Sequence, residues 1–336
     1  MRRRLSRGRV LGSVATVAAV ACVAAAPHFA GAHLSAAFDS LHGARRGWLG
    51  LAAAGYAAGY LTMAGAWRTA LAAGGARLPL SEVTARLGIG SIVNTFAPAR
   101  LGDAVKVALL SDSLEGPDRV WTTGGLYAAV AASRALPIAA LVVVASATGA
   151  LPLWPALALV GGVSVLLGVA LSPLRLRRFH RIAHLLDGLA ALAQSPRAAA
   201  TVVAWSTGTT VARLAATSAL AAALAVPHPV LAGLLIVTAL DVAGTLPLTP
   251  GNLGVASGAV AVALATRGID ATHAMGVGIA VQALETLVSL SAGSFGVLYV
   301  AGRRWPARTW AVRAAAVGSS VAIATVGALV FGLVSP

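Results

Sequence analysis

Six polar or charged side chains that could bind a phosphate group occur within or beside apolar stretches of the sequence. A guanidinium group suits phosphate because its planar fork donates two parallel hydrogen bonds. A charge at the centre of a bilayer costs about 2.5–3.5 kcal/mol even on a lenient insertion scale, so a membrane protein keeps few without a role. We therefore predict one central cavity that binds an anionic substrate through Arg100, Arg134, Arg213, Asn94, Asn252 and Asp103.

The same charges also have a structural explanation, in which they pair and help helices associate without touching a substrate. Asp103 would then neutralise Arg100 or Arg134, and Asp241 would neutralise Arg213. The sequence leaves both explanations open. In the binding hypothesis we expect Asp103 to orient Arg100 or Arg134.

Two apolar stretches, Leu80–Leu110 and Val230–Thr266, are split near their middle by proline and glycine. Their arms of about 12–18 residues are short against the roughly 20 residues that cross a bilayer. Proline ends a helix, and glycine lets the chain turn and approach closely. The N-terminus of the helix that follows each break would then favour binding of an anion. The alternative is that each break is only a kink that lets helices pack. We predict two re-entrant hairpins, broken at Pro98, Gly102, Pro250, Gly251 and Gly254.

The composition places these residues in a membrane protein. Of 336 residues, 58% are hydrophobic and 10% are charged, whereas a soluble domain carries about 25% charged residues. The mean hydropathy is +0.84. We predict an all-α integral membrane protein with about seven full spans: Val10–Ala26, Trp48–Ala72, Val120–Thr148, Leu151–Leu171, Arg197–Ala225, Ala274–Ala301 and Trp310–Val334.

Arginine clusters between the apolar runs set the expected orientation. Arg2–Arg9, Arg175–Arg181 and Arg303–Arg313 can all face the cytoplasm, although Arg45 and Arg46 then face outside. We expect a multi-pass protein of a bacterial plasma membrane with a cytoplasmic N-terminus, whose first apolar run is an uncleaved anchor rather than a signal peptide. Because the net charge of +15 lies in these short loops, we expect no nucleic-acid partner.

The two breaks resemble each other. FAPARLGDA (Phe96–Ala104) and LTPGNLGVA (Leu248–Ala256) share four of nine positions without a gap. Each break precedes a long span, and the arginine loops place the two broken stretches on opposite faces of the membrane. We therefore predict two inverted repeats, a transporter signature. The single membrane domain, 1–334, then contains repeat 1 (48–149), a connecting span with a cytoplasmic surface helix (150–196), repeat 2 (197–301) and an extra span (310–334).

Candidate metal and catalytic sites are weak. Cys22 is the one cysteine, which excludes a cysteine-based metal site within the chain. His180, His184 and Asp187 have helical spacing in an arginine-rich segment, and we interpret them as a solvated helix face rather than a metal site. We predict no metal, no cofactor and no catalytic residue.

With these residues in hand, the chain resembles the transmembrane region of lysylphosphatidylglycerol synthases, a flippase-like family. Asn94–Leu110 is similar to its N-x-x-x-P-x-R-x-G-[DE] pattern, and Leu246–Val260 to its P-x-T-P-G-x-x-G-V pattern. The likeness covers about residues 10–300. Ser257 and Glu285 stand where the family often has glutamate and arginine, so its substrate is not carried over.

The resemblance implies lipid translocation, and it argues against lysyl transfer because we expect no soluble synthase domain before the end at Pro336. We predict a flippase-like transporter of an anionic lipid or lipid-linked head group, whose partners are anionic or polyprenyl-phosphate-linked lipids. Two alternatives remain. One is a membrane-bound lipid-phosphate transferase using Asp112, Glu115 and Asp118. The other is an accessory subunit, with a glycosyltransferase of cell-envelope synthesis as its partner.

Overall fold

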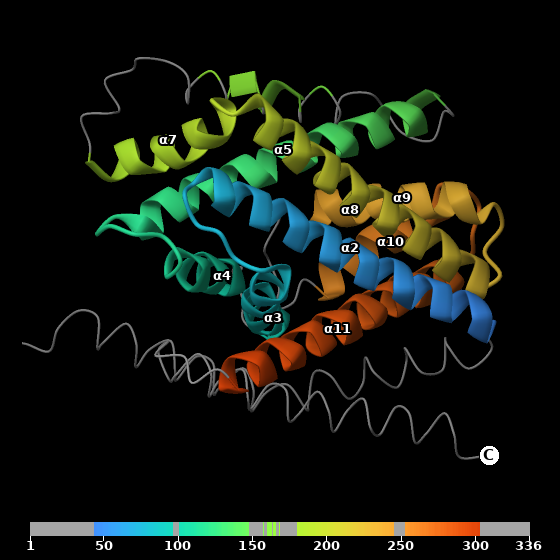
Figure 1. Cartoon of the computed structure of the whole chain (residues 1–336). Helices are drawn as coiled ribbons and strands as arrows, with labels where there is room; N and C mark the ends of the chain where they lie inside the picture. Colours follow the sequence, from blue (N-terminus) through green and yellow to red (C-terminus); the bar gives the residue numbers. More distant parts are fainter. Residues whose placement is uncertain are drawn as a thin grey trace, which may run out of the picture.

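The computed structural model describes residues 44–96, 101–147, 180–244 and 253–302, with seven further residues between 157 and 168. These residues form α-helices and no strand. Figure 1 labels the helices, which are α2 (Arg46–Ala73), α3 (Leu80–Phe96), α4 (Leu101–Ser111), α5 (Arg119–Ala147), α7 (His180–Ala193), α8 (Pro196–Ala223), α9 (Pro229–Ala243), α10 (Leu253–Ala265) and α11 (Ala271–Gly302).

Four long helices coincide with four of the predicted spans. Helices α2 and α8 have 28 residues each, α5 has 29 and α11 has 32, and 28 residues extend over about 42 Å. Among the described residues, Arg119–Ala147 and Ala271–Val300 are long and apolar enough to cross a membrane. The predicted spans at residues 10–26 and 310–334, and most of the one at 151–171, lie outside the described residues.

Helices α2 and α8 pack against each other in antiparallel orientation. Gly55, in the first half of α2, faces Ala216 in the second half of α8, whereas Gly65 lies against the indole ring of Trp205. A Cβ atom on Gly65 would lie 2.7 Å from that ring, so only glycine permits this approach. Midway along the pair, the hydroxyl groups of Thr62 and Thr209 are 3.0 Å apart.

Both broken stretches consist of two short helices. Helix α3 ends at Phe96 and α4 begins at Leu101, and α4 packs back along α3. Gly102 faces the carbonyl oxygen of Gly90, and Arg86 Nη1 donates to the carbonyl of Leu109 over 3.0 Å. Helices α9 and α10 likewise pack on each other, and the two hairpins lie toward opposite sides of the view in Figure 1.

Helix α7 packs along α5 (Figure 1). A Cβ atom on Gly188 would lie 2.1 Å from the carbonyl oxygen of Thr122, so the two backbones touch. Leu186 and Leu189 are buried in this contact region. The sequence predicts a helix here with its apolar residues against a membrane surface, whereas these two leucines pack on protein.

Two apolar cores lie on either side of the midpoint of the α2–α8 pair. Ala52 belongs to a core shared with α8, α9, α10 and α11. Trp67 belongs to another core, shared with α3, α5 and α7. Polar side chains lie between these two cores, near the middle of the long helices, where a membrane protein would hold a substrate site.

Candidate functional site

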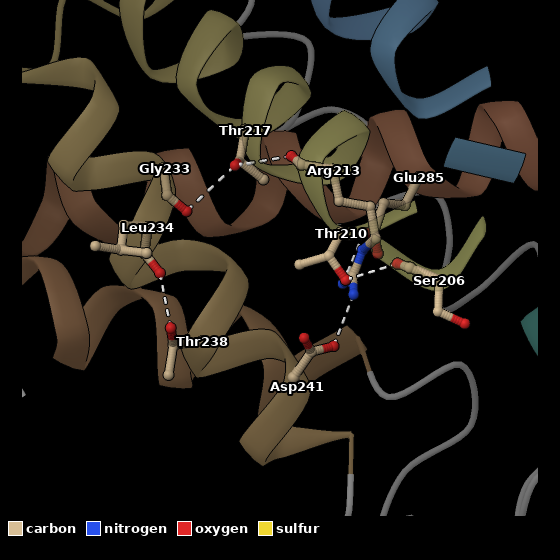
Figure 2. A network of polar contacts seen from close by, with 9 residues as sticks. All are labelled: Ser206, Thr210, Arg213, Thr217, Gly233, Leu234, Thr238, Asp241 and Glu285. Carbon is tan, nitrogen blue, oxygen red and sulfur yellow. Dashed lines mark hydrogen bonds and ion pairs between the residues drawn. The ribbon is translucent and has the colours of Figure 1, made fainter. Parts of the chain in front are cut away.

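Arg213 on α8 lies between two carboxylates from other helices. Its Nη1 donates to Oδ1 of Asp241 on α9 over 2.7 Å, and its Nη2 lies 3.6 Å from Oε1 of Glu285 on α11. Figure 2 shows the three side chains converging. Their side chains are 17%, 15% and 29% exposed. Charges buried to this degree are stable only when paired, so this cluster ties α8, α9 and α11 together.

Hydroxyl groups line α8 on both sides of Arg213 (Figure 2). Thr210 donates back to the carbonyl of Ser206 in the preceding turn, as serine and threonine commonly do inside helices. Thr217 reaches the carbonyl of Gly233 on α9 over 3.2 Å. The hydroxyl of Ser206 meets that of Ser133 on α5 at 2.8 Å. These contacts fix α8 against α5 and α9 around the arginine.

A cavity of about 330 Å³ opens beside the Arg213 cluster. Helices α2, α5, α8, α9, α10 and α11 all contribute to its wall. Arg134 of α5 and Arg213 of α8 both line it. Its charged and polar lining consists of Tyr56, Tyr60, Arg134, Thr209, Arg213, Asp241, Gln282, Glu285 and Ser289. We call this space the arginine cavity.

Some polar atoms at the arginine cavity are buried without a hydrogen bond to the described part of the chain. They include the hydroxyl of Tyr56 and Oδ2 of Asp241. A buried polar group without a partner costs free energy, and such groups are rare in folded proteins unless a ligand or ion completes them. The arginine cavity therefore has the chemistry of a binding site.

Asp103 organises a second group of polar residues at the first hairpin. Its Oδ1 accepts from Nδ2 of Asn94 at 2.8 Å and from Nζ of Lys106 at 3.0 Å. Its Oδ2 accepts from the hydroxyl of Tyr127 at 2.9 Å. Within the described residues its ion-pair partner is thus Lys106, one helical turn away on α4. Of the two partners considered from the sequence, Arg134 does not form this pair, and Arg100 lies outside the described residues.

A second cavity of about 210 Å³ lies beside Lys106. The described residues that line it are all polar: Ser91, Asn94, Thr95, Lys106, Gln282, Glu285, Thr286 and Ser289. Gln282, Glu285 and Ser289 also line the arginine cavity, so the two spaces adjoin along one face of α11. We call the second space the hydroxyl cavity.

The structure therefore divides the predicted site residues into three groups. Arg134 and Arg213 share the arginine cavity, and Asn94 lines the hydroxyl cavity. Asp103 lies beside the hydroxyl cavity through Asn94 and Lys106. The remaining predicted residues lie outside the described part of the chain: Arg100, Asn252, Pro98, Pro250 and Gly251.

The two predicted break glycines differ in their surroundings. A Cβ atom on Gly102 would lie 2.1 Å from the carbonyl oxygen of Gly90, so α3 and α4 depend on a glycine there. No atom of the described residues lies within 4 Å of the Cβ position of Gly254. A close backbone contact is therefore present at the first hairpin and not at Gly254.

Sequence reasoning did not identify the tyrosines or Ser289 as lining residues. Tyr56 and Tyr60 are four residues apart on α2 and therefore share one helix face. Gln282, Glu285 and Ser289 follow helical spacing on α11. That spacing was a signal available in the sequence, although it does not say which face of a helix points inward.

Three acidic residues, Asp112, Asp118 and Asp187, lie close to an arginine or a histidine side chain. Asp112 Oδ1 lies 3.0 Å from Arg119 Nη2. The imidazole of His184 lies 3.6 Å from Asp118 and 3.8 Å from Asp187. Within the described residues, no group of three histidine, cysteine or acidic side chains has the arrangement of a metal site.

The all-helical fold, with two described helices long and apolar enough to cross a membrane, agrees with an α-helical membrane protein. The chain belongs to the family described as the lysylphosphatidylglycerol synthase TM region, which matches residues 10–293. This match covers most of the chain, and it associates the protein with membrane lipids. No curated protein matches the chain.

Proposed function

We propose that the protein moves an anionic lipid or lipid-linked head group between the two leaflets of a bacterial plasma membrane. The arginine cavity is the observation that carries this proposal. It holds Arg134 and Arg213 between the apolar cores, and arginine is the residue best suited to bind phosphate. The hydroxyl of Tyr56 would donate to the same phosphate group.

Charge balance at Arg213 suggests how a phosphate would enter. Asp241 accepts at 2.7 Å, whereas Glu285 lies farther away, at 3.6 Å from the guanidinium. A phosphate oxygen can therefore replace Glu285 beside Arg213 while the shorter Asp241 contact remains. Arg134 supplies the second positive charge in the same cavity, so the substrate is held from two helices.

We further propose that residues 48–149 and 197–301 are inverted repeats. Equivalent helices of inverted repeats are related by an axis in the membrane plane, which requires them to run in opposite directions. Helices α2 and α8, the first helices of the two segments, are antiparallel. Helix α3 also contacts α11, just as α9 contacts α5. The arginine cavity would then lie at the repeat interface, where transporters place their sites.

The proposed orientation has a cytoplasmic N-terminus, and it places the loops after the two hairpins on opposite membrane faces. Glu115 and Arg267 occupy these loops and are exposed. In a Cys22→Ser background, Glu115→Cys and Arg267→Cys should react with an impermeant maleimide from opposite sides. Reaction of both from the same side would contradict the inverted repeats.

A leaflet-resolved lipid assay tests the function. Purified protein is reconstituted into vesicles with fluorescent phosphatidylglycerol, and a membrane-impermeant reductant bleaches the outer leaflet. We expect Arg134→Gln to reduce lipid movement at least tenfold. Arg134→Lys should also impair it, since lysine keeps the charge but loses the fork. The matched control is Arg119→Gln on the same helix, where the arginine pairs with Asp112 away from the cavity.

An unchanged rate in Arg134→Gln, with the vesicles containing equal amounts of folded protein, would contradict the proposed site. No observation in the described residues favours the transferase alternative, because Asp112 and Asp118 are engaged with Arg119 and His184.

A further inference from the structure

Glu285 on α11 lies in the wall between the two cavities, because it lines both of them. Its Oε1 is 3.6 Å from Nη2 of Arg213, whereas Oδ1 of Asp241 is 2.7 Å from Nη1 of the same guanidinium. Glu285 is therefore the more weakly held of the two carboxylates. It is the one that a phosphate group entering the arginine cavity displaces from Arg213.

The charges around Glu285 balance before any anion binds. Titratable side chains line the two cavities from α2, α4, α5, α8 and α9, whereas α3 and α10 line them with uncharged side chains. These titratable groups, with the carboxylate that pairs with Lys106, are Tyr56, Tyr60, Asp103, Lys106, Arg134, Arg213 and Asp241. Tyrosine is ordinarily neutral near pH 7, so among the described residues three cations face three carboxylates, with Glu285 counted. A bound phosphodiester therefore adds a negative charge that no described cation balances.

The added charge has its strongest effect on the displaced carboxylate. Once a phosphate oxygen lies beside Arg213, Glu285 is a buried carboxylate next to a second anion. A buried charge without a partner is strongly unfavourable, and such a group becomes neutral instead. Two anions that share one site likewise favour protonation of one of them. A phosphodiester stays ionised near neutral pH, so the proton binds to Glu285.

The hydroxyl cavity suits a protonated Glu285. Oδ1 of Asn94 lines this cavity and is buried without a hydrogen bond in the described part of the chain. A carboxylate only accepts hydrogen bonds, whereas a protonated carboxyl group also donates one, so protonation brings a donor to the cavity that holds this acceptor. The volume of about 210 Å³ gives room for several water molecules, each occupying roughly 30 Å³ in the liquid. Water in this space would carry protons to Glu285.

We propose that Glu285 is a proton-binding site and that the protein carries one proton with each singly charged anionic lipid. This proposal rests on the proposed function for lipid binding in the arginine cavity. The proton binds to Glu285 as the phosphate takes its place beside Arg213. It leaves when the phosphate departs and Glu285 pairs with Arg213 again. One negative charge and one proton cross together, so no net charge moves across the membrane.

Calorimetry of the full chain in detergent counts these protons without depending on transport. Dihexanoyl phosphatidylglycerol is titrated near pH 7.5 in buffers that differ in ionisation enthalpy, and the slope of the measured enthalpy against the ionisation enthalpy gives the protons taken up. We expect about one proton per lipid, and a Kd that rises about tenfold per pH unit between pH 7 and pH 8. Zwitterionic dihexanoyl phosphatidylcholine should cause no proton uptake. Phosphatidylglycerol binding without proton uptake would overturn the proposal.

Glu285→Gln tests the assignment to this side chain, because glutamine keeps the shape and cannot take up the proton. Proton uptake should fall from about one to about zero, and the Kd should no longer change with pH. The matched control is Glu115→Gln, since Glu115 is exposed in the loop between α4 and α5. This control should keep about one proton per lipid. Uptake of one proton by Glu285→Gln would overturn the assignment.

A pH gradient separates failure of the proton site from failure of leaflet movement. In vesicles whose lumen is one pH unit more alkaline than the outside, tracer phosphatidylglycerol should become about tenfold enriched in the inner leaflet, because one proton moves with each lipid. Protein-free vesicles should show no enrichment. Lipid movement that ignores the gradient would overturn the proton coupling and leave the transport proposal standing. Proton uptake on binding, with no lipid movement, would support the proton site and contradict the transport proposal.

Discussion

Arg213→Met is expected to lower the free energy of unfolding by about 3–5 kcal/mol, the usual cost of breaking a buried ion pair from one side. The variant leaves Asp241 and Glu285 without the guanidinium that lies 2.7 Å and 3.6 Å from them. Methionine keeps most of the side-chain volume of arginine. The decrease in the free energy of unfolding therefore reports the loss of the charged contacts and not the creation of a cavity.

Variants of Asp241 show how much of this free energy comes from the contact between Arg213 and Asp241. Asp241→Asn should cost less, about 1.5–3 kcal/mol, because a charged hydrogen bond is weakened while Arg213 keeps Glu285. The double variant Arg213→Met with Asp241→Asn should cost less than the sum of the two single variants. We expect a coupling energy of about 1–3 kcal/mol, the range for residues in direct contact.

Unfolding in mixed detergent micelles, followed by circular dichroism as the denaturing detergent is increased, measures these free energies. Arg119→Met is the control, because the Arg119 side chain is 40% exposed in its pair with Asp112 and exposed pairs contribute about 0–1 kcal/mol. If the double variant costs the sum of the single variants within about 0.5 kcal/mol, Arg213 and Asp241 do not act as a pair and the reasoning is refuted.

Three further predictions follow from local geometry. Gly102→Ala should destabilise the protein by about 1–3 kcal/mol through overpacking, because its Cβ would lie 2.1 Å from a backbone oxygen. Gly254→Ala should not destabilise it, because no atom of the described residues lies within 4 Å of that Cβ position. Equal losses in thermal unfolding would contradict this. Tyr127→Phe should lower the free energy of unfolding by about 1.5–3 kcal/mol, because it removes a hydrogen-bond donor to Asp103. If Asp103→Asn leaves the free energy of unfolding unchanged, the hydrogen bond between these two residues does not stabilise the protein. Backbone N–H groups of His273 and Thr272 hold the pKa of Asp270 below its usual value.

The sign of the Asp270 effect follows from that lowered pKa. The carboxylate stabilises the start of α11 fully above the pKa of the unfolded chain, and this stabilisation is lost as the pH falls through the lower pKa of the folded protein. Unfolding of the wild type should therefore become easier on acidification below about pH 4. Asp270→Asn should flatten that part of the profile, and an unchanged slope would contradict the assignment.

The long helices were predictable because their signal is local. Apolar runs such as Val120–Thr148 exceed the length needed to cross a bilayer, and α5 occupies Arg119–Ala147. The ends of the short helices follow a local signal too, since proline and glycine act on their own backbone. Helix α3 ends at Phe96 and α4 begins at Leu101, on either side of the predicted break at Pro98, which itself lies outside the described residues.

The partners of the charged residues were less accessible to sequence reasoning. The Arg213–Asp241 pair was one of the alternatives considered, and the structure contains it. Lys106 as the partner of Asp103 follows from spacing along one helix. The hydroxyl of Tyr127, by contrast, comes from a different helix. Which side chains meet across helices depends on rotation and packing, which periodicity does not specify.

We propose that the protein moves a phosphate-bearing lipid between leaflets through the arginine cavity. The most direct measurement is the fraction of fluorescent phosphatidylglycerol bleached from outside vesicles that contain the wild-type protein, compared with protein-free vesicles. We expect bleaching of more than the half of the fluorescent lipid that lies in the outer leaflet. Its rate should rise with protein density and fall at least tenfold in Arg134→Gln. Bleaching that stops at the outer-leaflet half in wild-type vesicles, with every lipid tested, would contradict it.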